Sequence, residues 1–281
     1  MNKEFPFELI LSGEQHRKIN RKFAGRISQW TPYVLCISIL IFFPLAFCSL
    51  LPAADGDSFL DMGLSSKYYE EGKVPNGWKL RKRFGYPKGA RAEWVTEDRI
   101  HAVRLHSEAA LTFLEKTVNI DTKEFPIVTW KWKVENIFKG NGERTKEGDD
   151  HPIRIFFVFK PDESKQSFWF RIKRFVYLDR IHGHPMGGRF TEYLWSSHLQ
   201  PGDIINDPGK PWQKLMVVEG GSRNLGKWLS HKRNLYEDFK KLYGEEPRRL
   251  IFIGILNDTD QTGQEATSYI ADLMFHKRNA A

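Results

Sequence analysis

The sequence predicts an all-β fold, a two-sheet sandwich of jelly-roll type with one inserted helix, preceded by an N-terminal hydrophobic helix. Three observations predict it. Short runs with alternating apolar and polar residues are bounded by Gly, Pro, Asn and Asp, which is typical of strands and turns. Helical periodicity appears in one segment of the body only. Strands and helices do not alternate, so a parallel α/β sheet is not indicated.

The clearest strand is predicted over residues 128–134. Trp130 and Trp132 alternate there with Lys131 and Lys133, so the two rings share one face and the two lysines the other. This pattern is typical of a strand with one side in the core and one side in water. We therefore expect both tryptophans to point inward.

Other runs complete the set of roughly nine strands. Two runs are apolar on both faces and predict central strands, residues 153–159 and 250–256. Five shorter runs predict further strands at residues 102–105, 111–116, 168–173, 215–219 and 268–275. One helix is predicted between Asn234 and the stop signal Gly244, because Leu235, Phe239 and Leu242 recur at helical spacing.

An uncharged apolar stretch comes before this body. No charged residue occurs from Ile27 to Ala54, and residues 33–51 are long enough to cross a hydrocarbon core of about 30 Å. Basic residues precede the stretch and acidic residues follow it, so the positive-inside rule places the N-terminus in the cytoplasm. We predict a basic cytoplasmic segment at 1–32 and a transmembrane signal anchor or cleaved signal peptide at 33–54. The domain at 55–281 is then extracytoplasmic (periplasmic), anchored to the inner membrane or secreted.

Charge and cysteine usage exclude several functions. The net charge is +8, but 43 basic residues are interspersed with 35 acidic ones, so no nucleic-acid partner is expected. Both cysteines, Cys36 and Cys48, lie inside the apolar stretch. The body therefore has no thiol for catalysis, disulfides or a cysteine zinc site.

Several motifs together carry a resemblance to a known family. They are Trp-Lys-Trp-Lys-Val at 130–134, Lys-Glu-Gly-Asp-Asp at 146–150, Asn-Asp-Thr-Asp-Gln-Thr-Gly at 257–263, the helix segment 234–239 and the closing run 269–275. In this order they resemble the bacterial exported domain-of-unknown-function family 3047, over roughly Val74 to Phe275. The resemblance implies export and the fold, and no chemistry. His151 and Pro152 depart from the pattern, where an aromatic and a small residue are expected.

The best metal ligands in the sequence are Asp258 and Asp260, which have the carboxylate spacing of the first half of a calcium loop. An EF-hand is excluded, because Tyr269 stands where the bidentate Glu is needed. A sandwich calcium site could still combine the two aspartates with backbone carbonyls. Alternatively, Asp beside Thr-Gly forms a turn by bonding its own backbone. Both interpretations stay open.

A second acidic pair, Asp149 and Asp150, lies directly before the predicted central strand that contains Arg154. An inward aspartate needs a partner, which Arg154 or Lys131 would supply. The alternative is catalytic, with Asp149 or Asp150 joining Asp258 or Asp260 as a carboxylate pair that hydrolyses a glycan.

Aromatic rings are a common means by which sandwiches bind sugars. Most of the nine tryptophans are expected in the core. Trp195 and Trp212 lie near Gly, Pro and Asp-rich turns and are predicted at the surface. The ligand-binding candidates are thus Asp149, Asp150, Arg154, Trp195 and Trp212.

These residues lead to a hypothesis of a non-catalytic extracytoplasmic domain that binds a glycan or another cell-envelope polymer, as galactose-binding and carbohydrate-binding sandwiches do. This step depends on fold analogy, and a fold does not fix function. The alternatives are a glycan-acting hydrolase that uses the acidic pairs, and an interaction domain for another exported protein.

Overall fold

A computed structural model describes residues 58–81, 89–139, 149–162, 164, 188–206 and 211–278. The predicted segments 1–32 and 33–54 and the strand predicted at 168–173 lie outside these residues. None of the helices in the described ranges has both the length and the apolar character that crossing a bilayer requires.

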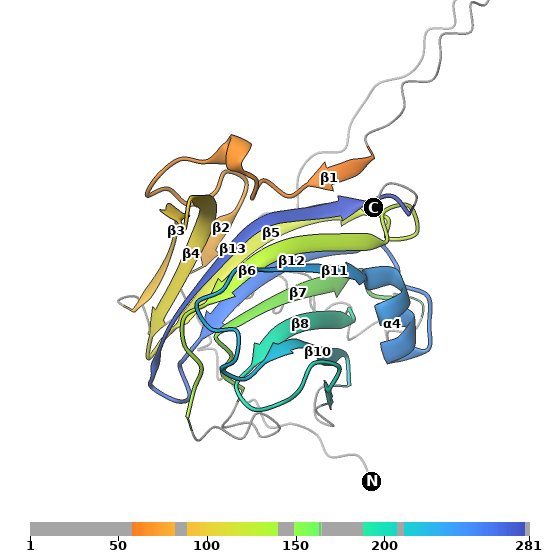
Figure 1. Ribbon diagram of the computed structural model, residues 1–281. Helices are drawn as coiled ribbons and strands as arrows, with labels where there is room; N and C mark the ends of the chain where they lie inside the picture. Colours follow the sequence, from red (N-terminus) through yellow and green to blue (C-terminus); the bar gives the residue numbers. More distant parts are fainter. Residues whose placement is uncertain are drawn as a thin grey trace, which may run out of the picture. The chain divides into compact units, whose positions relative to one another are not determined.

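The described residues form two sheets and one α-helix (Figure 1). The first sheet contains β1 (Phe59–Asp61), β3 (Ala90–Glu97), β4 (Ile100–Glu108), β6 (Ile127–Val134), β11 (Leu229–Asn234) and β13 (Glu265–His276). The second sheet contains β2 (Lys79–Arg81), β5 (Leu111–Ile120), β7 (Ile153–Phe159), β8 (Phe190–Ser196), β9 (Ile204–Asn206), β10 (Gln213–Gly220) and β12 (Leu250–Asp258). A 3-10 turn, η1 (Ser66–Tyr68), follows β1, and α4 (Leu235–Tyr243) follows β11.

The strand order places the predicted central strands in the centre. The first sheet runs β11-β6-β13-β4-β3, with β1 paired to β13, and the second runs β2-β5-β12-β7-β8-β10-β9. Neighbouring strands are antiparallel except β8 and β10, which are parallel. The all-β two-sheet sandwich with one helix is therefore confirmed. The thirteen strands in the described residues exceed the roughly nine predicted.

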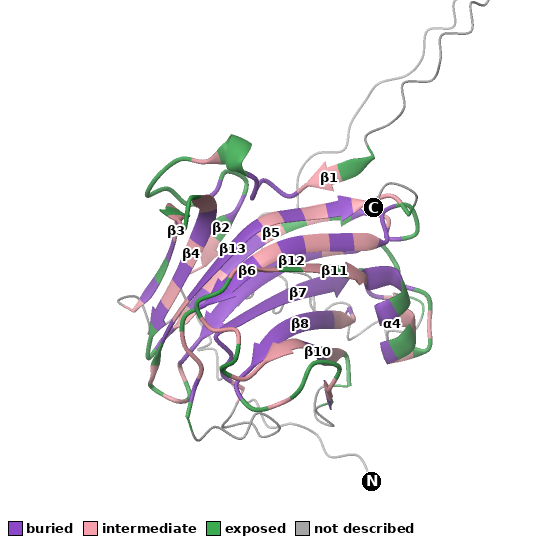
Figure 2. Ribbon diagram, in the orientation of Figure 1, coloured by how far each residue is buried: buried purple, intermediate pink, exposed green. Residues whose placement is uncertain are grey.

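The core lies between the two sheets, and Figure 2 shows β7 buried along its length, whereas β6 and β13 alternate between buried and partly buried residues. Trp130 and Trp132 are 1% and 0% exposed and share this core with Ile153, Ile155 and Phe157. The inward direction predicted for the two tryptophans is confirmed. Alternate positions of the same strand, Lys131 and Lys133, form ion pairs instead with acidic residues.

The helix begins and ends where its capping residues predict. The Asn234 side chain accepts a hydrogen bond from the Glu237 amide at 3.1 Å, and Gly244 adopts φ 67°, which favours glycine. Leu235, Phe239 and Leu242 are buried. Figure 1 shows α4 at one end of the strands, where the Phe239 ring packs 4.5 Å from that of Phe159.

Candidate functional site

An acidic cluster lies at the end of the sandwich away from α4. Strands β7 and β12 are antiparallel neighbours with Arg154 opposite Leu256, so the start of one lies beside the end of the other. Asp150 precedes β7, Asp258 ends β12 and Asp260 follows it. Carboxylate oxygens of these three aspartates lie within 4.8 Å of one another. The structure thus brings together members of both acidic pairs that the sequence singled out.

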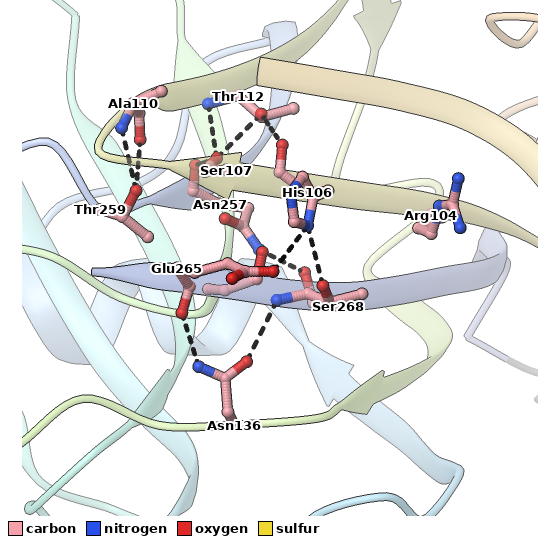
Figure 3. Close-up of polar contacts among 12 residues, drawn as sticks. Arg104, His106, Ser107, Ala110, Thr112, Asn136, Asn257, Thr259, Glu265 and Ser268 are labelled. Atoms are coloured by element: carbon pink, nitrogen blue, oxygen red, sulfur yellow. Dashed lines mark hydrogen bonds and ion pairs between the residues drawn. The ribbon is translucent and has the colours of Figure 1, made fainter. Parts of the chain in front are cut away.

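The loop after β12 is held in place by hydrogen bonds to two other segments. The Thr259 hydroxyl accepts from the Ala110 amide and donates to the Ala110 carbonyl, both at 3.0 Å (Figure 3). Asp150 accepts from the backbone amides of Gln261 at 3.3 Å and Thr262 at 2.7 Å. The cluster therefore stands on a loop with a fixed backbone, and Asp150 has a structural role whether or not an ion binds.

A buried polar network lies beside this loop and joins the two sheets (Figure 3). Ser107 and Ser268 come from the first sheet and Thr112 and Asn257 from the second, and all four are 0% exposed. The Asn257 side-chain amide donates to Ser268 Oγ at 3.0 Å, and the Ser107 hydroxyl lies 2.8 Å from the Asn257 carbonyl. The Asn257 side-chain oxygen is buried without a hydrogen-bond partner among the described residues, so the bonds that hold the two sheets together here come from its amide group and from the hydroxyls.

Arg154 connects the cluster to further acidic residues. Its guanidinium donates to Asp258 at 2.8 Å and to Asp149 at 3.2 Å, and Glu192 on β8 lies 3.9 Å away. The predicted ion pair between Arg154 and a preceding aspartate is present, whereas Lys131 pairs with Asp272. Burial disfavours the Arg154 charge, but the carboxylates outweigh burial and raise the pKa of the guanidinium above its usual value.

Asp258 carries the most unusual carboxyl group of the cluster. It is 3% exposed. Burial raises its pKa to about 7, and the charges of Asp260 and Asp150 add to this, although Arg154 opposes it. At neutral pH such a carboxyl either shares a proton or gains from a bound cation. The cluster can therefore hold a metal ion or act in proton transfer.

Trp195 does not have the predicted surface position. It is 0% exposed, its ring centroid lies 6.3 Å from that of Trp132, and its indole N–H donates to the Gly221 carbonyl at 3.1 Å. The prediction failed because β8 extends through the apparent turn residues up to Ser196, so the indole faces the core. Trp195 cannot stack on a ligand from solvent.

Trp212 is 41% exposed, as predicted, and lines a cavity of about 450 Å³. Phe159 and Phe239 lie behind this cavity, but they are only 1% and 2% exposed, so Trp212 supplies its accessible aromatic surface. Charged residues also line it, and they form two ion pairs, between Arg189 and Glu245 at 2.9 Å and between Arg248 and Asp162 at 2.8 Å. Here this space is called the Trp212 cavity.

The Trp212 cavity and the acidic cluster are separate sites. Phe159 ends β7 and Arg154 lies near its start, so roughly 17 Å of strand separates the two at about 3.3 Å per residue. Candidates for both sites were predicted from the sequence, but nothing in it assigned them to opposite ends of the strand. Glu192 was not predicted. Its only signal was a carboxylate in an otherwise mostly apolar run.

Solved structures that are weakly similar to this chain include carbohydrate-binding modules and a xyloglucanase domain. The family 30 carbohydrate-binding module of a cellulosomal cellulase of Clostridium thermocellum is 9% identical, with 79% of this chain and 98% of the module covered and a TM-score of 0.34. The mannan-recognising module TmCBM27 is 10% identical, with 79% and 96% covered and a TM-score of 0.32. The xyloglucanase domain of NopAA from Sinorhizobium fredii is 6% identical, with 76% and 100% covered and a TM-score of 0.37.

Similarity this low carries no argument about ligand or activity. No curated protein has a matching sequence. The match to a family model is stronger evidence than these structural similarities, because it spans residues 76–274 and so most of the chain. The chain belongs to the family described as Protein of unknown function (DUF3047).

Proposed function

We propose that this protein is a non-catalytic extracytoplasmic domain that binds a glycan or another cell-envelope polymer in the Trp212 cavity. The main support is the Trp212 indole, which is half exposed and lines a cavity of about 450 Å³. Ion-paired charged residues line the same cavity. Ligand sites are typically concave, with apolar and aromatic walls and a few polar groups that fix orientation. A flat ring can pack against a sugar face while the charged groups bond its hydroxyls.

The location of the domain is part of this proposal and depends on the sequence. The apolar stretch at 33–54 and the basic residues before it support export. We further propose that the sandwich has the jelly-roll topology of carbohydrate-binding modules. The basic surplus of the chain does not extend to the Trp212 cavity, whose lining has three basic residues (Lys160, Arg189 and Arg248) and three acidic ones (Asp162, Glu245 and Glu246). A ligand without net charge suits it best.

Replacing Trp212 with Ala is expected to weaken glycan binding about tenfold or more, because the stacking surface is lost. The measurement starts with a glycan array probed with the full-length chain in detergent, followed by calorimetric titration of the glycans that bind. Trp228→Ala is the matched control, since Trp228 packs on Tyr269 away from the cavity. Equal affinities of wild type and Trp212→Ala would contradict the proposal. An array without any binder would favour the interaction-domain alternative.

We also propose that the acidic cluster binds calcium with Asp150, Asp258 and Asp260. Oxygen ligands suit this ion, and three carboxylates within 4.8 Å of one another provide them. The loop that carries Asp258 is already held by Thr259 and Asp150, so the ion would stabilise the end of the sandwich rather than create its fold.

A glycan-acting hydrolase is the second candidate, and the raised pKa of Asp258 favours it. A carboxyl with a raised pKa close to other carboxyl groups is the arrangement of an acid and its partner. The oxygens lie within 4.8 Å, which is nearer to the retaining separation of about 5–5.5 Å than to the inverting one of roughly 6.5–9.5 Å.

The two candidates differ in their response to Asp150→Asn and Asp258→Asn. We expect no release of reducing ends from any bound glycan by the wild type, and unchanged glycan affinity in both variants, since the cluster lies at the far end of β7 from the Trp212 cavity. Turnover by the wild type that both variants abolish, with binding retained, would establish the hydrolase instead. Reducing-sugar assays and titrations on the same preparations give both readouts.

A further inference from the structure

One lysine occupies a strand position that faces the core. Lys116 on β5 lies directly opposite Ile253 on β12, which is 0% exposed. Directly opposite side chains share a face of the sheet. Leu114 and Val118, two positions before and after Lys116, belong to or pack on the main core. The Lys116 side chain therefore enters the edge of the space between the sheets.

The surroundings of the Lys116 ammonium leave its charge poorly compensated. In the described part of the chain its one contact is with the Trp78 ring, whose centroid lies 5.7 Å away. Gly77 adopts φ +77°, which favours glycine, and a Cβ added there would lie 2.9 Å from Lys116 Nζ, so the ammonium lies close to this turn. Burial lowers the pKa of Lys116, and the charge of Asp61 only partly opposes this.

Asp61 lies near Lys116, but its carboxylate is already bonded to other groups. Its carboxylate accepts hydrogen bonds from the Gly63 amide at 2.8 Å and the Ser65 hydroxyl at 2.6 Å, and it pairs with Lys67 at 3.2 Å. A half-buried ammonium without a bonded anion destabilises the folded state, and an anion bound from solution would offset this loss of free energy.

Lys116 also lines a cavity of about 500 Å³, and two exposed aromatic rings line it too. Phe59 is 41% and Tyr68 40% exposed, and they are two of the four large hydrophobic residues that are exposed in the described ranges. Lys67 and Asn119 supply polar groups to the same walls. Aromatic walls beside a cation that has no ion pair with a carboxylate in the described residues fit a ligand that has both a ring and an acidic group.

We propose that this Lys116 cavity is a second ligand site, which takes the carboxylate of an acidic sugar. Lys116 pairs with the carboxylate, Asn119 bonds hydroxyls, and Phe59 and Tyr68 hold the sugar ring. A monoanion suits the site better than a phosphate dianion, because Asp61 lines the same cavity and repels additional negative charge. The inference does not depend on the Trp212 cavity, which has no surplus charge to bind an acid.

The test compares two trisaccharides, one of glucuronate and one of glucose, by calorimetric titration of the full-length chain in detergent. We expect the glucuronate form to bind at least tenfold more tightly, and Lys116→Gln to remove this preference. Lys79→Gln is the matched control, because Lys79 is an exposed lysine on the neighbouring strand β2. The control should behave like the wild type, and Trp212→Ala should leave the glucuronate preference intact.

A loss of glucuronate binding in Lys116→Gln would not be caused by unfolding. Lys116→Gln removes an uncompensated charge, so its melting temperature should equal or exceed that of the wild type. Tyr68→Ala provides a second, exposed substitution that should weaken glucuronate binding several-fold. Equal affinity for both trisaccharides, or glucuronate binding that survives both substitutions, would overturn the proposal.

Discussion

Replacing Arg154 with Met is expected to lower the free energy of unfolding by about 3–5 kcal/mol at pH 8, because buried carboxylates lose their cation. Asp258 and Glu192 are 3% exposed each, and both lie within 4 Å of the guanidinium. Urea unfolding followed by tryptophan fluorescence measures the change. At pH 5 the loss should shrink, since Asp258 then carries a proton and has less charge to compensate.

Lys131→Met is the control for this prediction. Lys131 also forms an ion pair, with Asp272 at 2.9 Å, but these side chains are 42% and 32% exposed. Exposed pairs contribute about 0–1 kcal/mol, so the control should remain near wild-type stability. Similar losses in both variants, or an Arg154→Met loss that is the same at pH 5 and pH 8, would show that Arg154 does not neutralise the cluster.

The stability of the calcium-free protein is expected to fall as pH rises from about 4 to about 7. The pKa of Asp258 is about 7 in the folded protein against 3.8 ordinarily, so in this range the folded state keeps a proton that the unfolded state has released. Folding is then coupled to proton uptake, and raising the pH disfavours it. The fall is on the order of 4 kcal/mol at most, at about 1.4 kcal/mol per pKa unit.

Calcium should remove this fall. The ion binds the ionised carboxylates and so lowers the pKa of Asp258, which restores stability at pH 8. An ion at about one hundred times its dissociation constant adds about 2.7 kcal/mol. Thermal melting with calcium and with chelator, at pH 5 and pH 8, gives the comparison. Asp258→Asn should lose the response to both pH and calcium.

Asp272→Asn is the control for calcium, because Asp272 pairs with Lys131 outside the cluster and its φ of 53° is one that Asn also tolerates. It should retain the full calcium response. Wild-type melting at pH 8 that is the same in calcium and in chelator would rule out the metal site, while the pH dependence would still report the Asp258 carboxyl.

The elements predicted correctly are those with strong local patterns. Strand β7 has exactly the predicted bounds, and β6 and α4 differ from prediction by a residue or less at each end, since alternation and capping are encoded in neighbouring residues. Strand β11 was missed because Leu229–Asn234 contains mostly polar residues and takes its place by pairing with β6. Local sequence does not encode that pairing.

The sequence identified the residues of the acidic cluster, but it did not predict that they lie together. Asp150 and Asp258 meet because Arg154 lies opposite Leu256, a register between strands about a hundred residues apart that no spacing rule supplies. Lys116 was overlooked although the sequence carried a signal. It interrupts the apolar series of Leu114, Val118 and Ile120. A charged residue at a core-facing position of a strand indicates a functional or structural role.

The pairing of β1 with β13 has a mechanical consequence. Phe59 lies opposite His276, so the first strand of the described body pairs with the end of the last one. A tether pulling on residue 58 against a load at residue 277 would part these strands from the end, one bond after another, rather than shear them together. The three-residue β1 would therefore peel away under small forces while the rest of the sandwich stays closed. Because Phe59–Asp61 lines the Lys116 cavity, tension applied at residue 58 would open that cavity first.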